Sequence, residues 1–248
     1  MKTILITGAT AGIGEACALQ FGLQGHRLIL TGRRQDRLDQ MVNKLRGEGV
    51  QVTSLCFDVT KRQEVDKAIA SLTKTWREVD VLINNAGLAV GLSLIQDGDV
   101  DDWERMIDTN IKGLLYVTRA IAPNMVERKE GHIINVSSIA GKDVYKYGNV
   151  YCATKHAVDA LSKAMRIDMV EDGIKVTNIA PGMVETEFSL VRFKGDADKA
   201  DKVYQKFTPL NAEDIADAIV YVTNTPKHVC VNDMVITPTA QASLVYTA

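Results

Sequence analysis

Residues 3–14, TILITGATAGIG, join a short apolar run to three glycines with the spacing G-x-x-x-G-x-G. The apolar run has the β-branched composition of a buried strand, and the periodic segment 13–24 predicts a helix directly after the glycines. Glycines let a backbone turn tightly and approach a ligand, and a helix N-terminus offers unpaired N–H groups and a positive dipole end. This order of strand, turn and helix favours binding of a dinucleotide pyrophosphate, although glycines alone also occur in ordinary turns.

Apolar strand-like runs alternate with helical periodicity along almost the whole chain. This alternation is typical of a parallel sheet covered by helices, and near-continuous apolar runs fit strands buried on both sides. We therefore predict an α/β fold with a single domain, residues 1–248: a Rossmann-type, doubly wound sheet of about seven parallel strands with helices on both faces. The expected strands are 3–7, 27–31, 51–57, 79–84, 132–137, 175–180 and 234–237, and the expected helices are 13–24, 34–47, 61–76, 100–128, 150–171 and 212–223.

One long segment, residues 183–210, interrupts this rhythm. It is charged, but it carries Phe188, Phe193 and Phe207 among its polar residues. Long connections without an obvious element are often functional in compact domains. We expect this segment to be a lid that packs over a ligand.

Composition narrows the classes of partner. The 248 residues are 46% hydrophobic and carry a net charge of only −2, which gives no electrostatic reason to expect nucleic acid or an anionic membrane surface. No apolar run approaches the roughly 18 residues needed to span a bilayer, and no basic leader precedes the first strand. The four cysteines and four histidines show no metal-ligand or dithiol spacing. We expect a cytoplasmic protein with a small-molecule ligand, reduced cysteines and no metal.

The end of the second predicted strand indicates which dinucleotide binds. An NAD site would place an acidic residue there, on the ribose 2′-hydroxyl, whereas this chain has Thr31-Gly32-Arg33-Arg34. A carboxylate would repel a 2′-phosphate, but a guanidinium pairs with it through charge-assisted hydrogen bonds. The pair Arg33 and Arg34 therefore favours NADP, the alternative being a solvated basic pair at a helix start.

Tyr151 and Lys155 lie four residues apart in a predicted helix, so their side chains share one face. A phenol with a pKa near ~10 is a poor base at neutral pH. An adjacent ammonium group and a positively charged nicotinamide would both lower that pKa, and Tyr151 could then exchange a proton with a substrate oxygen. On spacing alone, Lys155 could equally be an exposed helix charge.

Taken in order, these motifs resemble those of the short-chain dehydrogenase/reductase family. Further matches are Asn84-Asn85-Ala86-Gly87 after the fourth strand, Asn110 in the long helix, Ser138 after the fifth strand and Pro181-Gly182 after the sixth. The resemblance spans essentially the whole chain. It implies an enzyme that moves a hydride between NADP(H) and an alcohol or carbonyl carbon, with Tyr151 as the proton-transfer residue.

The resemblance also implies roles for individual residues. Ser138, thirteen residues before Tyr151, would hydrogen-bond the substrate oxygen, and Asn110 would hold a water that connects Lys155 to solvent, unless it is a capping or buried amide. Asp58 would contact the adenine amino group, and the segment Pro181–Thr186 would flank the nicotinamide. The implied cofactor contacts are Gly8, Thr10, Ala11, Gly12, Ile13, Gly14, Arg33, Arg34, Asp58, Val59, Asn85, Ala86, Gly87, Tyr151, Lys155, Pro181, Gly182, Val184 and Thr186.

Longer strings resemble one branch of this family, the NADP-dependent 3-hydroxy acid dehydrogenases, which also oxidise serine and allo-threonine. They are NAGLAVG at 85–91, DWERMIDTN at 102–110, MVER at 125–128 and EFSLVRFKGD at 187–196. A small carboxylate substrate needs a cationic partner, and Arg192 stands in an otherwise apolar stretch, so Arg192 or Lys194 is expected to bind the carboxylate unless the pair forms a lid salt bridge.

Two rival functions remain at this point. One is reduction of a bulkier ketone on the same fold, which the lid strings argue against. The other is a catalytically silent NADP-binding regulator, for which loss of Tyr151 or Lys155 would be expected. The family resemblance also implies a homotetramer assembled through the two long helices, about 100–128 and 150–171.

Overall fold

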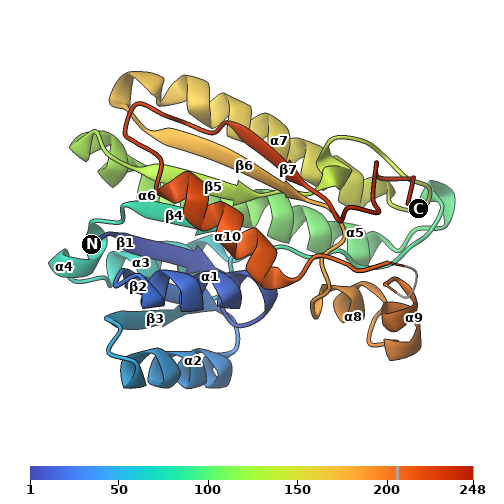
Figure 1. Cartoon of the computed structure of the whole chain (residues 1–248), viewed down its shortest axis with the longest axis horizontal. Coiled ribbons are helices and arrows are strands. Elements are labelled where there is room, and N and C mark those ends of the chain that lie inside the picture. The colour runs from blue at the N-terminus through green and yellow to red at the C-terminus, as the bar shows by residue number, and fades with distance from the viewer. Residues whose placement is uncertain (205–206, 248) are drawn as a thin grey trace.

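The computed structural model describes residues 1–204 and 207–247 and contains one seven-stranded sheet. Its strand order is β3-β2-β1-β4-β5-β6-β7, and every neighbouring pair is parallel (Figure 1). The predicted fold class is therefore confirmed. The strands are β1 (Thr3–Thr7), β2 (Arg27–Gly32), β3 (Val52–Cys56), β4 (Val81–Asn84), β5 (His132–Val136), β6 (Lys175–Pro181) and β7 (Asp233–Ile236).

Helices cover both faces of this sheet (Figure 1). The α-helices are α1 (Gly12–Leu23), α2 (Gln35–Gly47), α3 (Arg62–Ala70), α4 (Lys74–Arg77), α5 (Val100–Ile107), α6 (Leu114–Arg128), α7 (Asn149–Asp168), α8 (Phe188–Arg192), α9 (Ala197–Lys202) and α10 (Ala212–Thr223). Short helical turns are η1 (Ile95–Asp97), η2 (Asp108–Gly113), η3 (Ile139–Gly141) and η4 (Val170–Asp172).

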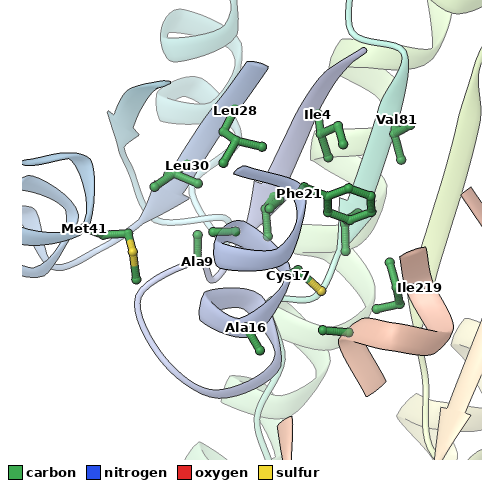
Figure 2. Close-up of a cluster of buried hydrophobic side chains, with 14 of the residues drawn as sticks. Ile4, Ala9, Ala16, Cys17, Phe21, Leu28, Leu30, Met41, Val81 and Ile219 are labelled. Atoms are coloured by element: carbon green, nitrogen blue, oxygen red, sulfur yellow. The ribbon is translucent and has the colours of Figure 1, made fainter. Parts of the chain in front are cut away.

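Alternate residues of β1 point into two separate hydrophobic cores. Ile4 and Ile6 pack with α1, α2 and α10, whereas Leu5 packs on the other face with α3, α6 and α7. Figure 2 shows the first core, in which Phe21 and Cys17 of α1 lie between the sheet and Ile219 of α10. This two-sided burial explains why the strands are apolar at nearly every position.

The chain adds β2 and β3 on one side of β1, and then adds β4, β5, β6 and β7 on the other side. The switch point of the sheet therefore lies between β1 and β4. In open α/β sheets, ligands bind outside the carboxyl ends of the strands at such a switch point. The glycine turn follows β1 and the Asn84–Gly87 motif follows β4. The topology thus brings these two motifs to one crevice.

Two predicted helices differ from the structure. The helix expected at 61–76 is broken after Ala70, and α4 begins only at Lys74, because Arg77 turns back to donate hydrogen bonds to the carbonyls of Leu72 and Ala70 (both 2.7 Å). The helix expected at 100–128 is continuous in direction but contains a π-helical turn, η2, that includes Asn110. Such turns are frequent at functional sites.

The predicted lid is not a structureless loop in its described part. It contains α8 and α9, and Val184 pairs with Leu210 in an isolated parallel bridge. Residues 205 and 206 of the predicted 183–210 segment lie outside the described residues.

His132, the first residue of β5, makes the stability of the fold sensitive to acid. It is buried, and its Nε2 is 2.8 Å from Thr177 Oγ1. Burial, assisted by the charges of Lys175 and Lys2, lowers the pKa of His132 from 6.5 to about 3. Between these values the unfolded chain binds more protons than the folded chain, so stability is lost as the pH falls below 6.5. We expect this group alone to lower the unfolding free energy by about 2 kcal/mol between pH 7 and pH 5.

Urea denaturation at several pH values tests this expectation. His132→Asn should remove that part of the pH dependence, whereas His228→Asn, at an exposed position, should leave it intact. An unchanged pH slope in His132→Asn would show that other groups cause the acid sensitivity.

Candidate active site

The turn between β1 and α1 has the geometry of a phosphate cradle. Gly8 and Gly12 have positive φ values of 66° and 54°. A Cβ on Gly14 would lie 2.3 Å from the Gly8 carbonyl oxygen, so only glycine allows this approach. Helix α1 has no side-chain cap, which leaves its first N–H groups facing the crevice without a side-chain acceptor. The backbone here fits a pyrophosphate group, with Thr10, Ala11 and Ile13 completing the turn.

The Asn84–Gly87 segment is fixed beside this turn by hydrogen bonds to β1. Thr7 Oγ1 accepts from the backbone N–H groups of Asn85 (3.0 Å) and Ala86 (2.9 Å). The Asn85 side-chain amide donates to the carbonyls of Thr7 (2.9 Å) and Gly8 (3.2 Å). The two motifs therefore form one wall of the crevice.

Asn110 is a buried amide whose side chain makes three hydrogen bonds within the protein. Its Oδ1 accepts from Leu88 N–H (2.8 Å), and its Nδ2 donates to Leu88 O (2.8 Å) and Thr154 Oγ1 (3.0 Å). These bonds tie the loop after β4 to α7. The side chain is buried and its contacts position the residues around Lys155, while the water-holding role of Asn110 stays a prediction.

Three arginines gather where β2 meets α2. Arg33, whose side chain is 63% exposed, pairs with Asp58 at 3.5 Å. Arg34 donates to Thr10 Oγ1 (3.0 Å) and, more loosely, to Glu187 (3.5 Å), while Arg37 donates to Glu187 at 2.9 Å. Two carboxylates face three guanidinium groups, so the cluster retains positive charge and fits a phosphate dianion.

Both carboxyl groups in this cluster ionise more easily than usual. Burial alone would raise the pKa of Asp58, but hydrogen bonds from Thr60 and the nearby Arg33 outweigh it and lower that pKa. Burial likewise opposes ionisation of Glu187, and Arg37 with Arg34 more than compensates. Val59, next to Asp58, lies against Gly113, where a Cβ would be 2.7 Å from the Val59 methyl group.

Tyr151 and Lys155 lie on one face of α7, as their spacing predicts. They are buried, with exposures of 9% and 6%, and Lys155 Nζ lies 5.9 Å from the centre of the Tyr151 ring. Lys155 is therefore not an exposed helix charge. Its ammonium donates to the Val136 carbonyl at 3.1 Å.

The pKa expectation for Tyr151 is wrong in direction for the protein by itself. Burial raises the pKa of Tyr151 above its ordinary value, while the Ser138 hydroxyl and the Arg192 charge oppose that rise. Burial also lowers the pKa of Lys155 to about 8. Removal from water disfavours both charged forms, and this effect exceeds the attraction between the two groups.

Ser138 stands between η3 and the end of β6. Its Oγ accepts from Ala140 N–H at 3.1 Å and lies 3.4 Å from the Pro181 carbonyl oxygen. The neighbouring Ser137 instead donates to the Ile179 carbonyl at 3.2 Å and is buried. Of the two serines, Ser138 is the one that contacts Tyr151.

The loop after β6 meets the glycine turn. A Cβ on Gly12 would lie 3.3 Å from Thr186, whose Oγ1 accepts from Phe188 N–H at 3.2 Å. Pro181, Gly182 and Val184 lead from the end of β6 to this point. The segment predicted to flank the nicotinamide thus meets the same glycine turn that contacts the Asn84–Gly87 segment.

Arg192 and Lys194, the two candidates for an anion partner, have different surroundings. The Arg192 guanidinium carbon lies 5.6 Å from the centre of the Tyr151 ring and 5.3 Å from that of Tyr145, whose hydroxyl accepts from Arg192 Nη2. Arg192 Nε is buried and has no partner among residues 1–204 and 207–247. Lys194 instead pairs with Asp102 (2.7 Å) and Asp99 (3.3 Å). Of these two candidates, Arg192 is the one with a buried donor beside Tyr151 that no described residue uses.

A cavity of about 250 Å³ opens beside Tyr151. A larger groove, of about 580 Å³, lies between α3, α4 and α6, away from the carboxyl ends of the strands. The smaller one is the candidate substrate site because it contains Tyr151. Its other lining residues include Val90, Leu92, Trp103, Met106 and Asn149.

Three residues at the site carry no signal that sequence reasoning could use. Tyr145 holds Arg192, Glu187 joins the lid to Arg34 and Arg37, and Gln241 contacts the loop after β6. Each meets its partner only through the fold. Within the described part of the chain, no group of three or more His, Cys, Asp or Glu residues could hold a metal ion, and no helix is long and apolar enough to cross a membrane.

Comparison with known proteins gives consistent matches over the whole chain. Residues 2–196 match the family model described as short chain dehydrogenase. The chain is 49% identical over 240 residues to NADP-dependent 3-hydroxy acid dehydrogenase YdfG of Salmonella typhi, covering 96% of each chain. It is 42% identical over 240 residues to serine 3-dehydrogenase of Rhizobium radiobacter, covering 97% of this chain and 95% of that protein.

Solved structures are similar to this chain in both fold and sequence. The closed form of a serine dehydrogenase complexed with NADP+ matches with a TM-score of 0.94 and 46% identity, over 99% of this chain and 98% of the other. A serine dehydrogenase from Escherichia coli matches with a TM-score of 0.84 and 41% identity, over 97% of this chain and 99% of the other.

Proposed function

The chain belongs to the short-chain dehydrogenase family, and we propose that it is an NADP-dependent 3-hydroxy acid dehydrogenase. It transfers a hydride between NADP(H) and the carbon that bears the 3-hydroxyl of short acids such as serine, allo-threonine, 3-hydroxyisobutyrate or 3-hydroxypropionate. One observation supports the substrate class: Arg192 holds a buried Nε donor beside the Tyr151 ring, and this donor has no partner within the described part of the chain. A small acid is the ligand that such a donor needs.

NADP, when bound, accepts or donates the hydride. The glycine turn would hold its pyrophosphate, and Arg33 and Arg34 would pair with the 2′-phosphate. Asp58, Val59 and the Asn85–Gly87 backbone would line the adenosine. Backbone groups near Val184 and the Thr186 hydroxyl would hold the carboxamide at the other end of the crevice.

Tyr151 is proposed to exchange the proton with the substrate oxygen. Because burial raises its pKa, Tyr151 is protonated at neutral pH and is ready to donate during carbonyl reduction. During alcohol oxidation it needs a route for losing its own proton, and Lys155, with a pKa of about 8, is poised to supply one. Ser138 would hydrogen-bond the same oxygen. Asn110 would hold the loop after β4 against α7 and so keep Tyr151 and Lys155 in position.

The rival substrate class is a bulkier ketone. A cavity of about 250 Å³ that contains charged Lys194 and Asp102 is small and polar for such a molecule. The rival non-catalytic regulator would not require Tyr151, Lys155 and Ser138 to meet at one point of the crevice. The acid dehydrogenase therefore accounts for more of the site than either rival.

An absorbance assay of the reduced nicotinamide tests the proposed function. Purified protein should reduce NADP+ faster than NAD+ with serine, allo-threonine, 3-hydroxyisobutyrate or 3-hydroxypropionate as substrate. Turnover of only neutral alcohols or bulky ketones would favour the first rival. Binding of NADPH without any turnover would favour the second.

Arg192→Leu tests the substrate class. We expect the KM for 3-hydroxypropionate to rise about 10- to 100-fold, because a charge-assisted hydrogen bond contributes about 1.5–3 kcal/mol. The Michaelis constant for NADP+ should stay within about twofold. Lys194→Leu tests the other candidate, because Lys194 lines the same cavity; its ammonium group already pairs with Asp99 and Asp102, so its effect on this KM should be much smaller. An unchanged KM in Arg192→Leu would remove the carboxylate assignment.

We also propose that the chain works in the cytoplasm as a homotetramer assembled through α5, α6 and α7. Apolar side chains are exposed on these helices, including Leu115 (37%) and Ile167 (74%). Light scattering on the purified protein would give the mass of four chains. A monomer at micromolar concentration would refute this assembly.

A further inference from the structure

Gln241 lies in the C-terminal segment that follows β7, far along the chain from any motif. Its own N–H donates to the Pro238 carbonyl at 2.8 Å, and it pairs with Thr247 in an isolated antiparallel bridge. The segment therefore folds back on itself. In Figure 1 it ends at the same end of the sheet as α8 and α9. Leu244 of this segment packs against the hydrophobic cluster that contains Tyr151.

The Gln241 side chain turns inward to the loop after β6. It is only 2% exposed, and its Oε1 accepts from the Met183 N–H at 2.9 Å. Gly182 donates its own N–H to the Ile236 carbonyl at 2.7 Å. The start of the loop is thus held from two sides, by the end of β7 and by Gln241.

Gln241 and the loop are in close contact at Gly182. A Cβ on Gly182 would lie 2.3 Å from Gln241 Oε1. Gly182 does not have a positive φ, so a larger residue there would act by displacing the Gln241 side chain. Only four residues further on, Thr186 meets Gly12 of the phosphate turn. A shift at Gly182 and Met183 would therefore be passed directly to the crevice.

The other end of the same amide has no partner. Gln241 Nε2 is enclosed and makes no hydrogen bond within residues 1–204 and 207–247. An enclosed donor without an acceptor destabilises a fold, and an apolar side chain of similar size would avoid that penalty. The hydrogen bond that Oε1 accepts from the Met183 N–H is therefore the contact that favours glutamine here, and it acts on the loop after β6.

We propose that Gln241 is a positioning residue for the nicotinamide half of the cofactor. Through its hydrogen bond to Met183, it holds the loop Gly182–Thr186 at the distance from the glycine turn that the nicotinamide requires. The C-terminal segment is then part of the cofactor site. This inference rests on the proposed function, since it takes NADP as the cofactor.

Two probes separate this role from a general structural one. NADP+ carries both halves of the cofactor, whereas 2′,5′-ADP carries the 2′-phosphate and adenosine but no nicotinamide. In titration calorimetry, Gln241→Leu should weaken NADP+ binding about tenfold and leave 2′,5′-ADP binding within about twofold. The emission of bound NADPH should also move toward that of free NADPH, because the nicotinamide environment is loosened.

A matched control is Gln51→Leu, at an exposed position just before β3 and therefore at the opposite end of the sheet from the crevice. It should bind both probes as the unaltered protein does. Gln241→Met, which keeps the unbranched shape but lacks both polar atoms, provides a second variant if leucine prevents folding, and the same selective loss is expected.

The outcomes are distinct. Equal loss of both probes would mean that Gln241 only stabilises the fold, and no loss of either would mean that it does not act on the loop; each overturns the inference. If the unaltered protein itself failed to bind NADP+, the proposed function would fall as well. Selective loss of NADP+ affinity supports the inference independently of turnover.

Discussion

Tyr151→Phe should lower kcat/KM for oxidation of a 3-hydroxy acid by about 10³-fold. The substitution removes one hydroxyl and keeps the ring that contacts Phe188, Arg192 and Lys155. A positioned acid–base group contributes about 10²–10⁴-fold to a rate, and in the proposed mechanism Ser138 binds the substrate oxygen without replacing Tyr151 as the proton-transfer group. Steady-state kinetics with saturating NADP+ measures the effect.

Cofactor binding is the internal control for this variant. The affinity for NADPH should change by no more than a few-fold, because the proposed phosphate contacts lie elsewhere. Tyr221→Phe, at an exposed position on α10, should retain full activity. Dehydrogenation by Tyr151→Phe at an undiminished rate would refute the proposed mechanism.

Removing the two guanidinium groups after β2 should reverse much of the cofactor preference. In the double variant Arg33→Ala/Arg34→Ala, the ratio of kcat/KM for NADP+ to that for NAD+ should fall by about 10²-fold. Two charge-assisted hydrogen bonds to a phosphate could contribute more, but both side chains are partly exposed and screened by solvent. The effect should fall on KM for NADP+, with little change in KM for NAD+.

Lys44→Ala is the matched control, because Lys44 is an exposed cation in the last turn of the same helix, α2. It should leave the ratio within about twofold. Raising the salt concentration should weaken NADP+ binding to the unaltered protein more than to the double variant. If the double variant still preferred NADP+ to the same degree, the 2′-phosphate would have to be bound elsewhere.

Local sequence was sufficient to predict where some parts of the candidate site lie in the fold. The glycine turn, the Asn84–Gly87 segment and the pair Tyr151 and Lys155 all lie where their spacing predicts. Their places after a strand or on one helix face depend on neighbours within a few residues, so period and spacing predict them, whereas their roles were inferred from the family resemblance. The same reasoning predicted the doubly wound sheet from the alternation of strand and helix.

Sequence spacing could not predict side-chain contacts between residues that are far apart in the chain. Arg192 meets Tyr145 across 47 residues, Glu187 meets Arg37 across 150, and Gln241 meets Met183 across 58. No local pattern carries those pairings. The choice between Arg192 and Lys194 was likewise open until the fold showed which side chain faces Tyr151 and which faces Asp99 and Asp102.

The sequence by itself determined the sheet, through short-range periodicity, and its resemblance to a known family predicted the cofactor crevice and the acid–base pair. Only the tertiary structure decided the ionisation of that pair. It also decided where the loop after β6 lies relative to the glycine turn. Burial, which depends on every element packed around α7, raises the pKa of Tyr151 and lowers that of Lys155. A charge beside a charge can be inferred from spacing, but the removal of water from both requires the packed fold.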